Sequence, residues 1–424
     1  MNHFGEIDIK NYKKHLFSLE TEKEMRSFYT SVAFCNRCGT CAQVCPTYLR
    51  TLEEPFSPRG RNQAIRLILE GKINVAKNKP LLKKIAYSCT LCGRCQKACA
   101  GKIPTAQHVL ELRRLLKNRA LPRTLFWLLK LRQLNPELFA KFLHTALTLR
   151  RFGFIKFLRF SGIANLLNSA WLHQADQLLP VYARTAWTEL AQNLSALKSP
   201  NKKENFIYLP SLEASYFLPE IQSAVLKNYP NSVYWPNTPS GLFEYVYGDL
   251  RAARKQVKNL IVRHQQTGNG KLKLLTDSID VYNFFQNAPS LFDTPHWQNK
   301  ARVFAKYVHF SFPTSKRITL TGPVCLDDTA VLGTDNKPFE EAKIYLCKNV
   351  ENFVQFTYYI GLPALGYDFI KGALQLNNIS LEQVKQARIK TIVTLSGLSA
   401  MQWNYMFKKH GIAASAVHIV RLNG

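Results

Sequence analysis

Acidic residues are scarce in this 424-residue chain. It has 28 Asp and Glu against 57 Lys and Arg, which gives a net charge of +29 at pH 7. A basic surface of this size favours an anionic partner: nucleic acid, anionic lipid or an acidic protein. Charge alone supports nucleic acid, and no named nucleic-acid-binding module is present. We therefore expect no nucleic-acid partner.

Three further patterns are missing. No uninterrupted apolar run is long enough to span a bilayer, so no transmembrane helix is predicted. The first ten residues, Met1–Lys10, lack the apolar core of a secretory signal, so we expect a cytoplasmic protein. There is no G-x-G-x-x-G after a predicted strand and no P-loop. We therefore expect any FAD to lie on a partner subunit and not on this chain.

Cysteine, in contrast, is concentrated in one part of the chain. Eight of the ten cysteines form two runs with the spacing C-x2-C-x2-C-x3-C. The first run is Cys35, Cys38, Cys41 and Cys45, followed by Pro46, and the second is Cys89, Cys92, Cys95 and Cys99. Three thiolates on one tight loop can bind three corners of an iron–sulfur cube, whereas the fourth, three residues further on, points elsewhere.

In two-cluster ferredoxins the fourth cysteine of such a run binds the other cluster. We therefore predict two [4Fe–4S] clusters that share the eight cysteines in a crossed arrangement. Cluster 1 is assigned to Cys35, Cys38, Cys41 and Cys99, and cluster 2 to Cys89, Cys92, Cys95 and Cys45. Zinc sites do not need a third cysteine at the next x2 step, and a disulfide framework requires an oxidising compartment.

The segments around the cysteine runs have helical periodicity. Helices are expected over Asp8–Thr30, Asn62–Gly71, Leu81–Tyr87 and Ile103–Leu116, with Gly71 as the stop signal of the second. His108, in the last of them, is expected to be a polar helix residue and not a ligand, because both clusters are already complete. The region is thus predicted to be mostly helical, with the clusters held in loops.

These segments together resemble a known family. CNRCGTCAQVCPTY, SPRGR, LILEG and SCTLCGRCQKAC look like the iron–sulfur subunit of glycolate oxidase and its relatives, which serve 2-hydroxy acid dehydrogenases. The resemblance implies a two-cluster ferredoxin-like module. It also implies two copies of a cysteine-rich domain that heterodisulfide reductases and the anaerobic glycerol-3-phosphate dehydrogenase contain. Ala100 departs from the pattern, since the family usually has proline after the last cysteine.

Residues 121–200 are rich in Leu and Phe and strongly basic. Pro136 and Gly153 divide the stretch into helices. Over residues 121–160 only Glu137 opposes the cations, which are Arg123, Lys130, Arg132, Lys141, Arg150, Arg151, Lys156 and Arg159. Two partners fit such a cationic amphipathic helix pair. One is an anionic membrane interface, which would place the protein peripherally on the inner face of the cytoplasmic membrane. The other is a protein surface, that of the cluster domain or of a partner subunit.

From residue 201 the texture changes to alternating strands and helices. Short β-rich runs, NFIYLP, SVYWP, KLKLLT, ITLTG and KTIVTL, alternate with helical segments such as Ala252–His264, which predicts parallel strands with helical crossovers. SGLFEYVYGDLRAARK and GPVCLDD resemble segments of the family's paired cysteine-rich domains. Two copies are therefore expected, over 206–300 and 317–424.

Nearly all cysteines of those domains are replaced. Pro239 and Ser240 stand before Gly241 in the first copy. In the second copy only Cys325 survives; the replacements are Tyr359, Ile360, Leu395 and Leu398. Cys347 matches no family ligand. Because one thiolate cannot hold a cluster, Cys325 and Cys347 are expected to be ordinary small buried residues. The C-terminal half is expected to fold without metal.

The predicted fold class is a multidomain α+β protein. It comprises a mostly helical ferredoxin-like domain with two [4Fe–4S] clusters over 1–120 and a basic helical linker over 121–200. Two degenerate cysteine-rich-type α/β domains follow, over 201–310 and 311–424.

The predicted function is electron transfer. As the resemblance implies, a partner flavoprotein would oxidise a 2-hydroxy acid and pass electrons through the clusters to a quinone or another carrier. The alternative is an iron–sulfur scaffold or adaptor for another redox complex, such as a glycerol-3-phosphate dehydrogenase or a heterodisulfide reductase-like system.

Overall fold

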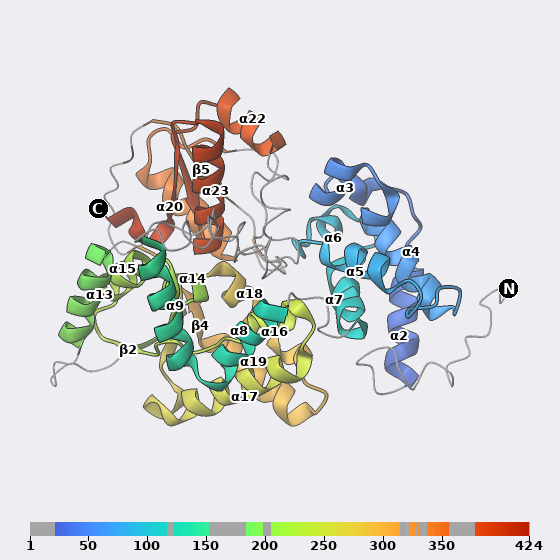
Figure 1. Cartoon of the computed structure of the whole chain (residues 1–424), viewed down its shortest axis with the longest axis horizontal. Helices are drawn as coiled ribbons and strands as arrows, with labels where there is room; N and C mark the ends of the chain where they lie inside the picture. The colour runs from blue at the N-terminus through green and yellow to red at the C-terminus, as the bar shows by residue number, and fades with distance from the viewer. Residues whose placement is uncertain are drawn as a thin grey trace.

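The structure, a computed structural model, describes residues 22–116, 123–151, 184–197, 205–313, 320, 322–327, 330, 337–355 and 378–423. Figure 1 shows a group of N-terminal helices at one end of the molecule and two groups of strands and helices at the other. The predicted mixture of helices and small parallel sheets is confirmed. Within the described residues, no helix is both long enough and apolar enough to cross a membrane.

The two cysteine runs lie among short helices. Their bounds are α2 (Glu22–Ala33), η1 (Thr40–Ala42), α3 (Pro46–Thr51), η2 (Glu54–Phe56), α4 (Pro58–Leu69), α5 (Lys79–Tyr87), α6 (Arg94–Ala98) and α7 (Thr105–Leu115). Ile65 and Ile68 of α4 pack against Leu82 of α5 and Leu112 of α7 in one buried core. The predicted helices near residues 62–71, 81–87 and 103–116 are therefore confirmed. Of the expected helix Asp8–Thr30, residues 1–21 lie outside the described residues.

α4 shows why these helices begin and end where they do. The Ser57 hydroxyl accepts a hydrogen bond from the backbone N–H of Gly60 (2.9 Å), and Pro58 occupies the first helical position, where its missing N–H costs nothing. Gly71, at φ +72°, closes the far end, as predicted. A Cβ atom on Gly60 would lie 1.9 Å from the backbone oxygen of Glu54, so only glycine fits there.

Three helices of the basic stretch are described: α8 (Arg123–Leu134), α9 (Pro136–Arg151) and α13 (Arg184–Leu197). Asn135 separates the first two, and its side-chain oxygen accepts from the backbone N–H of Leu138 (3.0 Å). Phe139 and Ala140 of α9 are buried against Tyr216, so this face packs on the C-terminal half of the chain. Gly153, Lys156 and Arg159, and the side chains of Arg123, Arg150 and Arg151, lie outside the described residues.

The first sheet contains four parallel strands. β1 (Phe206–Leu209), β2 (Ser232–Tyr234), β3 (Lys273–Thr276) and β4 (Val308–Phe310) lie in the order β2-β1-β3-β4. The helices of this sheet are α14 (Leu212–Tyr216), α15 (Pro219–Asn228), α16 (Leu242–Tyr247), α17 (Leu250–Gln266), α18 (Ile279–Gln286) and α19 (Pro295–Tyr307), with η3 (Gly268–Gly270) and η4 (Ala288–Leu291). β1, β2 and β3 were predicted from their β-rich runs; β4 was not.

The second sheet contains three parallel strands, β5 (Val324–Asp327), β6 (Thr391–Thr394) and β7 (Ser415–His418), in that order. Its helical segments are α20 (Lys337–Asn349), α22 (Asn378–Gln386), α23 (Gly397–His410) and η5 (Ile419–Asn423). β6 was predicted. The run ITLTG falls largely outside the described residues, and the strand of this region is β5.

The carboxyl ends of the strands of both sheets meet. The backbone N–H of Ile279, just after β3, donates to the backbone oxygen of Leu395, just after β6 (2.9 Å). The side chain of Ser396 donates to Asp280 (3.3 Å). The two sheets are thus joined by hydrogen bonds at the edge where parallel-sheet proteins usually bind ligands.

Candidate iron–sulfur site

The two cysteine loops have the same backbone shape. Arg37 and Leu91, which precede the second cysteine of each run, both have φ +57°. Gly39 and Gly93, which follow it, have φ +88° and +71°. Left-handed residues inside a short loop turn successive backbone N–H groups toward one side, which makes a concave surface for an anion. Each loop is therefore shaped to surround an anionic group.

The fourth cysteines also match. Cys45 (φ −84°, ψ 112°) precedes α3, and Cys99 (φ −81°, ψ 125°) follows α6; both are extended. All ten cysteines of the chain lie within the described residues, and none is in a disulfide. The donors required by two [4Fe–4S] clusters are thus present as thiols in two equivalent halves.

One group of thiols lies around Cys41. Burial raises the pKa of this thiol to about 11, and the neighbouring charges of Cys35, Cys45 and Cys99 raise it further. A Cβ atom on Gly101 would lie 3.6 Å from the Phe34 ring and 3.9 Å from the Cys99 sulfur. Cys99 therefore lies beside the residue that precedes Cys35.

The other group lies around Cys95, whose pKa is raised well above its usual value by burial and then by the charges of Cys92, Cys89 and Cys45. Cys45 acts on both groups, so its place is decided by a further contact. The guanidinium of Arg61 donates to the Cys45 sulfur (3.7 Å) and interacts with the charges of Cys89 and Cys95. The eight cysteines thus come together as two neighbouring sets, with Cys45 close to the second run.

Arg61 is a buried cation at this second set. Its side chain is 1% exposed and also donates to the backbone oxygen of Ile85 (3.2 Å) and the hydroxyl of Ser88 (3.0 Å). Burial alone would lower the pKa of Arg61, but the thiolates of Cys89, Cys45 and Cys95 raise it above its ordinary value. The guanidinium therefore stays charged inside the protein.

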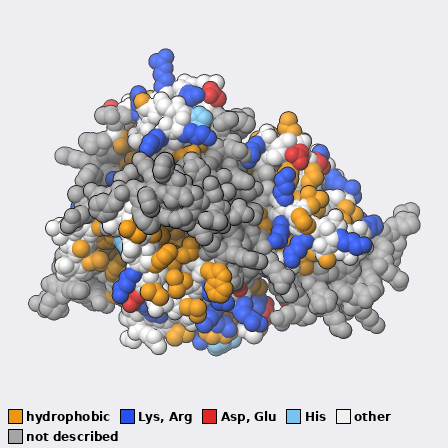
Figure 2. Space-filling view, viewed as in Figure 1, with side chains coloured by type: hydrophobic (Ala, Val, Ile, Leu, Met, Phe, Trp, Pro, Cys, Tyr) orange, Lys and Arg blue, Asp and Glu red, His pale blue; other side chains and the backbone are white. Residues whose placement is uncertain are grey.

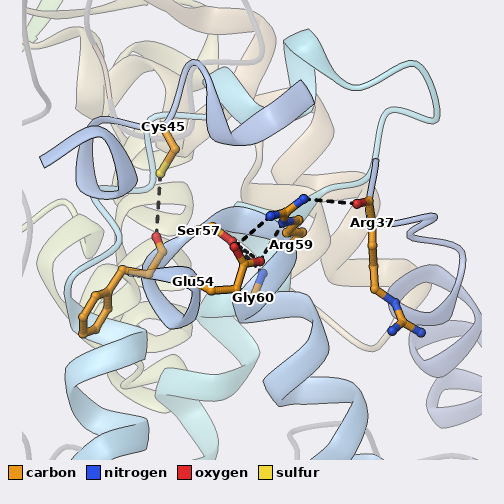
Figure 3. Close-up of polar contacts among 7 residues, drawn as sticks. Arg37, Cys45, Glu54, Ser57, Arg59 and Gly60 are labelled. Atoms are coloured by element: carbon orange, nitrogen blue, oxygen red, sulfur yellow. Dashed lines mark hydrogen bonds and ion pairs between the residues drawn. The ribbon is translucent and has the colours of Figure 1, made fainter. Parts of the chain in front are cut away.

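Arg59 lies at the first set (Figure 3). Its side chain donates to both carboxylate oxygens of Glu54 (2.6 and 3.0 Å) and to the backbone oxygen of Arg37 (3.3 Å). Its backbone N–H lies within hydrogen-bonding reach of the Cys41 thiol. The motif Ser57–Arg61 thus sends one arginine to each set of cysteines, a role that sequence reasoning missed although it quoted the motif.

Arg113 of α7 joins the cysteine region to the C-terminal half. It donates to the backbone oxygens of Ala86 (3.1 Å), Cys89 (2.6 Å) and Val246 (2.8 Å). Burial lowers the pKa of this guanidinium, an effect opposed first by the charge of Cys89. A Cβ atom on Gly248 would lie 2.9 Å from the backbone carbon of Arg113, so α7 packs directly on the end of α16.

His108 is not placed as a ligand. Its Nδ1 lies 2.9 Å from the Asn62 oxygen and its Nε2 lies 2.9 Å from the Ser31 hydroxyl. Burial lowers the pKa of the imidazole to about 4, so it is neutral at physiological pH. The prediction of a polar helix residue is confirmed.

The C-terminal half differs from expectation at one cysteine. Cys325 in β5 is fully buried, as predicted. Cys347 is exposed, which corrects the prediction: it follows the buried Leu346 and so lies on the outer face of the amphipathic helix α20. Leu395 and Leu398 are buried at the cysteine-replaced positions, whereas Tyr359 and Ile360 lie outside the described residues.

A buried polar cluster that the sequence did not reveal lies where the two sheets meet. Asp277, just after β3, accepts hydrogen bonds from the Tyr208 hydroxyl and from the backbone N–H of Ser211 (2.9 Å). Beside it, Glu213 is 3% exposed, and its Oε1 has no partner within the described residues. Burial, and then the charge of Asp277, raises the pKa of Glu213 to about 8. Glu213 is thus the carboxyl that keeps its proton.

Comparison with known proteins identifies the N-terminal region. Residues 31–103 match the family of 4Fe-4S dicluster domains. The chain therefore contains an iron–sulfur dicluster domain, and the two loops described above lie within it.

The particular relatives are subunits of redox systems. The chain is 32% identical over 131 residues to Hdr-like menaquinol oxidoreductase iron-sulfur subunit 2 of Archaeoglobus fulgidus, covering 27% of this chain and 24% of that protein. It is 34% identical over 94 residues to lactate utilization protein B of Macrococcus caseolyticus (21% and 18%). It is 28% identical over 105 residues to the probable glycolate oxidase iron-sulfur subunit of Bacillus subtilis (22% and 23%).

Each match thus spans about a quarter or less of the relative's length. No solved structure matches the chain significantly. The resemblance to the glycolate oxidase iron–sulfur subunit family is confirmed for the N-terminal part of the chain.

Proposed function

We propose that this chain is an iron–sulfur electron-transfer subunit. Cys35, Cys38, Cys41 and Cys99 would hold cluster 1, and Cys89, Cys92, Cys95 and Cys45 would hold cluster 2. The observation that carries the proposal is the pairing of two equivalent cysteine loops with a buried guanidinium, Arg61, among the thiolates of the second set. A buried cation requires a compensating anion, and a cluster with four thiolates supplies one.

The electron donor is proposed to be a flavoprotein of the 2-hydroxy acid dehydrogenase type. Each cluster carries one electron, so two clusters match the electron pair of a reduced flavin, whose protons pass to solvent. A quinone would complete the balance by taking two electrons and two protons. The names of the glycolate oxidase and lactate utilization relatives support this donor class. The Hdr-like relatives support the alternative of an adaptor in a heterodisulfide reductase-like system.

The crossed ligation is tested by Cys45→Ser. Anaerobically prepared parent protein should contain about eight iron atoms per chain, because two cubes of four use all eight cysteines. The variant should lose the EPR signal of cluster 2 and keep that of cluster 1, with iron falling toward four. Cys347→Ser, at an exposed cysteine outside both sets, is the matched control and should retain all the iron. Loss of cluster 1 alone would contradict the assignment.

The acceptor side is proposed to include an anionic membrane surface, which α8 and α9 would contact. One face of these helices is packed, but large apolar side chains remain exposed on the other: Trp127, Leu134, Leu138, Phe142 and Leu149. Figure 2 shows apolar side chains gathered on the face of the molecule that carries these helices. Lys130 and Lys141 are exposed, whereas Arg132 is turned inward, over the Phe243 ring. An apolar surface bordered by cations suits the headgroup region of an anionic bilayer.

This contact is tested with vesicles. Binding to anionic vesicles should weaken with rising salt, and Lys130→Glu with Lys141→Glu should weaken it by at least about 30-fold, because each cation near the surface contributes roughly 1 kcal/mol. Lys343→Glu with Lys348→Glu, on α20, is the charge-matched control and should bind like the parent. Equal binding to neutral and anionic vesicles would contradict the electrostatic part. Absence of binding would favour a protein partner for this face.

A further inference from the structure

The two sets of cysteines differ in the charge that surrounds them. Around the second set lie two arginines, Arg61 and Arg113, whose side chains are 1% and 0% exposed. Arg61 donates to Cys45 Sγ, Ile85 O and Ser88 Oγ. Within the described part of the chain, no carboxylate accepts from either guanidinium. Both positive charges are therefore available to act on a cluster held by these cysteines.

Arg113 acts through the backbone of a ligand. Its Nη2 donates to the carbonyl oxygen of Cys89 at 2.6 Å, and its guanidinium lies 4.8 Å from the centre of the Tyr87 ring. The donors also reach Ala86 O and Val246 O, which fix the side chain in one position. A second permanent cation is thus held next to Cys89 without solvent to screen it.

The first set has an arginine of a different kind. Arg59 is 32% exposed and makes a bidentate ion pair with Glu54, which is 48% exposed. The carboxylate cancels most of the field of this guanidinium, and solvent screens the remainder. Cys38, in the same loop, is exposed, whereas Cys45 is buried.

We propose that Arg61 and Arg113 make cluster 2 the more easily reduced of the two clusters. The inference rests on the proposed function, because it assumes that both clusters are present. Reduction adds one negative charge to a cluster. Burial of the cluster opposes that charge, but the same low dielectric strengthens its attraction to two cations fixed beside the ligands. Cluster 1 lacks this attraction, because Glu54 neutralises Arg59.

The charge distribution gives electron transfer a direction. An electron accepted at cluster 1, near the exposed Cys38, passes to cluster 2 and is retained there. Cluster 2 is the one linked to α16 through Arg113 and Val246. Electrons thus move from the exposed edge of the N-terminal helices toward the C-terminal half.

The test is an anaerobic redox titration of the full-length holoprotein, followed by EPR, with iron measured on each sample. Arg61→Gln and Arg113→Gln should each lower the higher midpoint potential and leave the lower one in place. At the parent's higher midpoint, the ratio of reduced to oxidised cluster should fall at least about tenfold, which corresponds to about 59 mV for one electron. Arg113→Lys retains the charge and should shift the potential less.

Glu54→Gln provides the opposite test at an exposed residue, where folding is not at risk. It removes the negative partner of Arg59 and should raise the lower midpoint, which narrows the gap between the clusters. The proposal is overturned if the arginine variants shift the lower midpoint, shift both equally, or shift neither. If a glutamine variant does not fold, Glu54→Gln decides alone, and an unchanged gap refutes the proposal. Protein with far fewer than eight irons would instead refute the proposed function.

Discussion

Removal of the iron should unfold helices α2–α7 and leave the two sheets folded. In the iron-free protein Arg61 and Arg113 would remain buried without the anion that balances them, and an uncompensated buried charge costs about 3 to 5 kcal/mol. Two such charges match most of the 5 to 15 kcal/mol that stabilise a typical domain. In addition, α3 and α6 have only six and five residues, so they depend on the cysteines beside them.

The measurement is hydrogen exchange before and after oxidative removal of iron with a chelator. Amides of α4 and α5 should lose protection, while β1, β3 and β6 should keep it. Chelator without oxidant, which leaves the clusters intact, is the control treatment. The double variant Arg61→Leu with Arg113→Leu should keep more protection in its iron-free form than the iron-free parent, because it has no buried charge to compensate. Full protection of α4 in the iron-free parent would contradict the charge argument.

The local features of the N-terminal region could be predicted because each has a local cause. The x2, x2, x3 cysteine spacing marks the two loops, and Gly71 marks a helix end. The roles of Arg59 and Arg61 could not be predicted in the same way. The acceptors of Arg61 are up to 27 residues distant, and nothing in the letters SPRGR tells which arginine is buried.

The strands divide for a similar physical reason. β1, β3 and β6 lie in runs of β-branched, aromatic and other apolar residues, so they could be found. β4 (Val308–Phe310) has three residues, with His309 in its centre, and β7 (Ser415–His418) contains Ser and His. A run this short carries no period, and only pairing with a neighbouring strand defines it.

The polar cluster between the sheets could not be predicted, because its members are far apart in the sequence. Asp277 follows β3, whereas Glu213 lies in the first turn of α14 and reads as an ordinary residue of a helix start. A Cβ atom on Gly397 would lie 2.5 Å from Cγ of Glu213, so the beginning of α23 packs directly on this side chain. The burial that raises the Glu213 pKa therefore results from the meeting of the two sheets.

Replacement of this residue by Glu213→Gln should make the protein more stable above pH 8. The folded-state pKa of Glu213 is about 8, whereas a glutamate in the unfolded chain has a pKa of 4.5. Between these values the folded state holds a proton that the unfolded state has lost, so stability falls as pH rises through this window and the full loss is reached above pH 8. At about 1.4 kcal/mol per pKa unit, the loss amounts to at most roughly 5 kcal/mol.

Glutamine has the shape of the protonated carboxyl and cannot ionise, so the variant should lose this part of the pH dependence. Thermal unfolding followed between pH 5 and 9 should give similar midpoints for parent and variant at pH 5, and a higher midpoint for the variant at pH 9. Glu340→Gln, an exposed glutamate on α20, removes the same charge and should keep the parent's pH profile. A variant that is destabilised equally at every pH would mean that the Glu213 carboxyl is needed for packing at the junction of the sheets. Its ionisation would then not be what limits stability in alkaline solution.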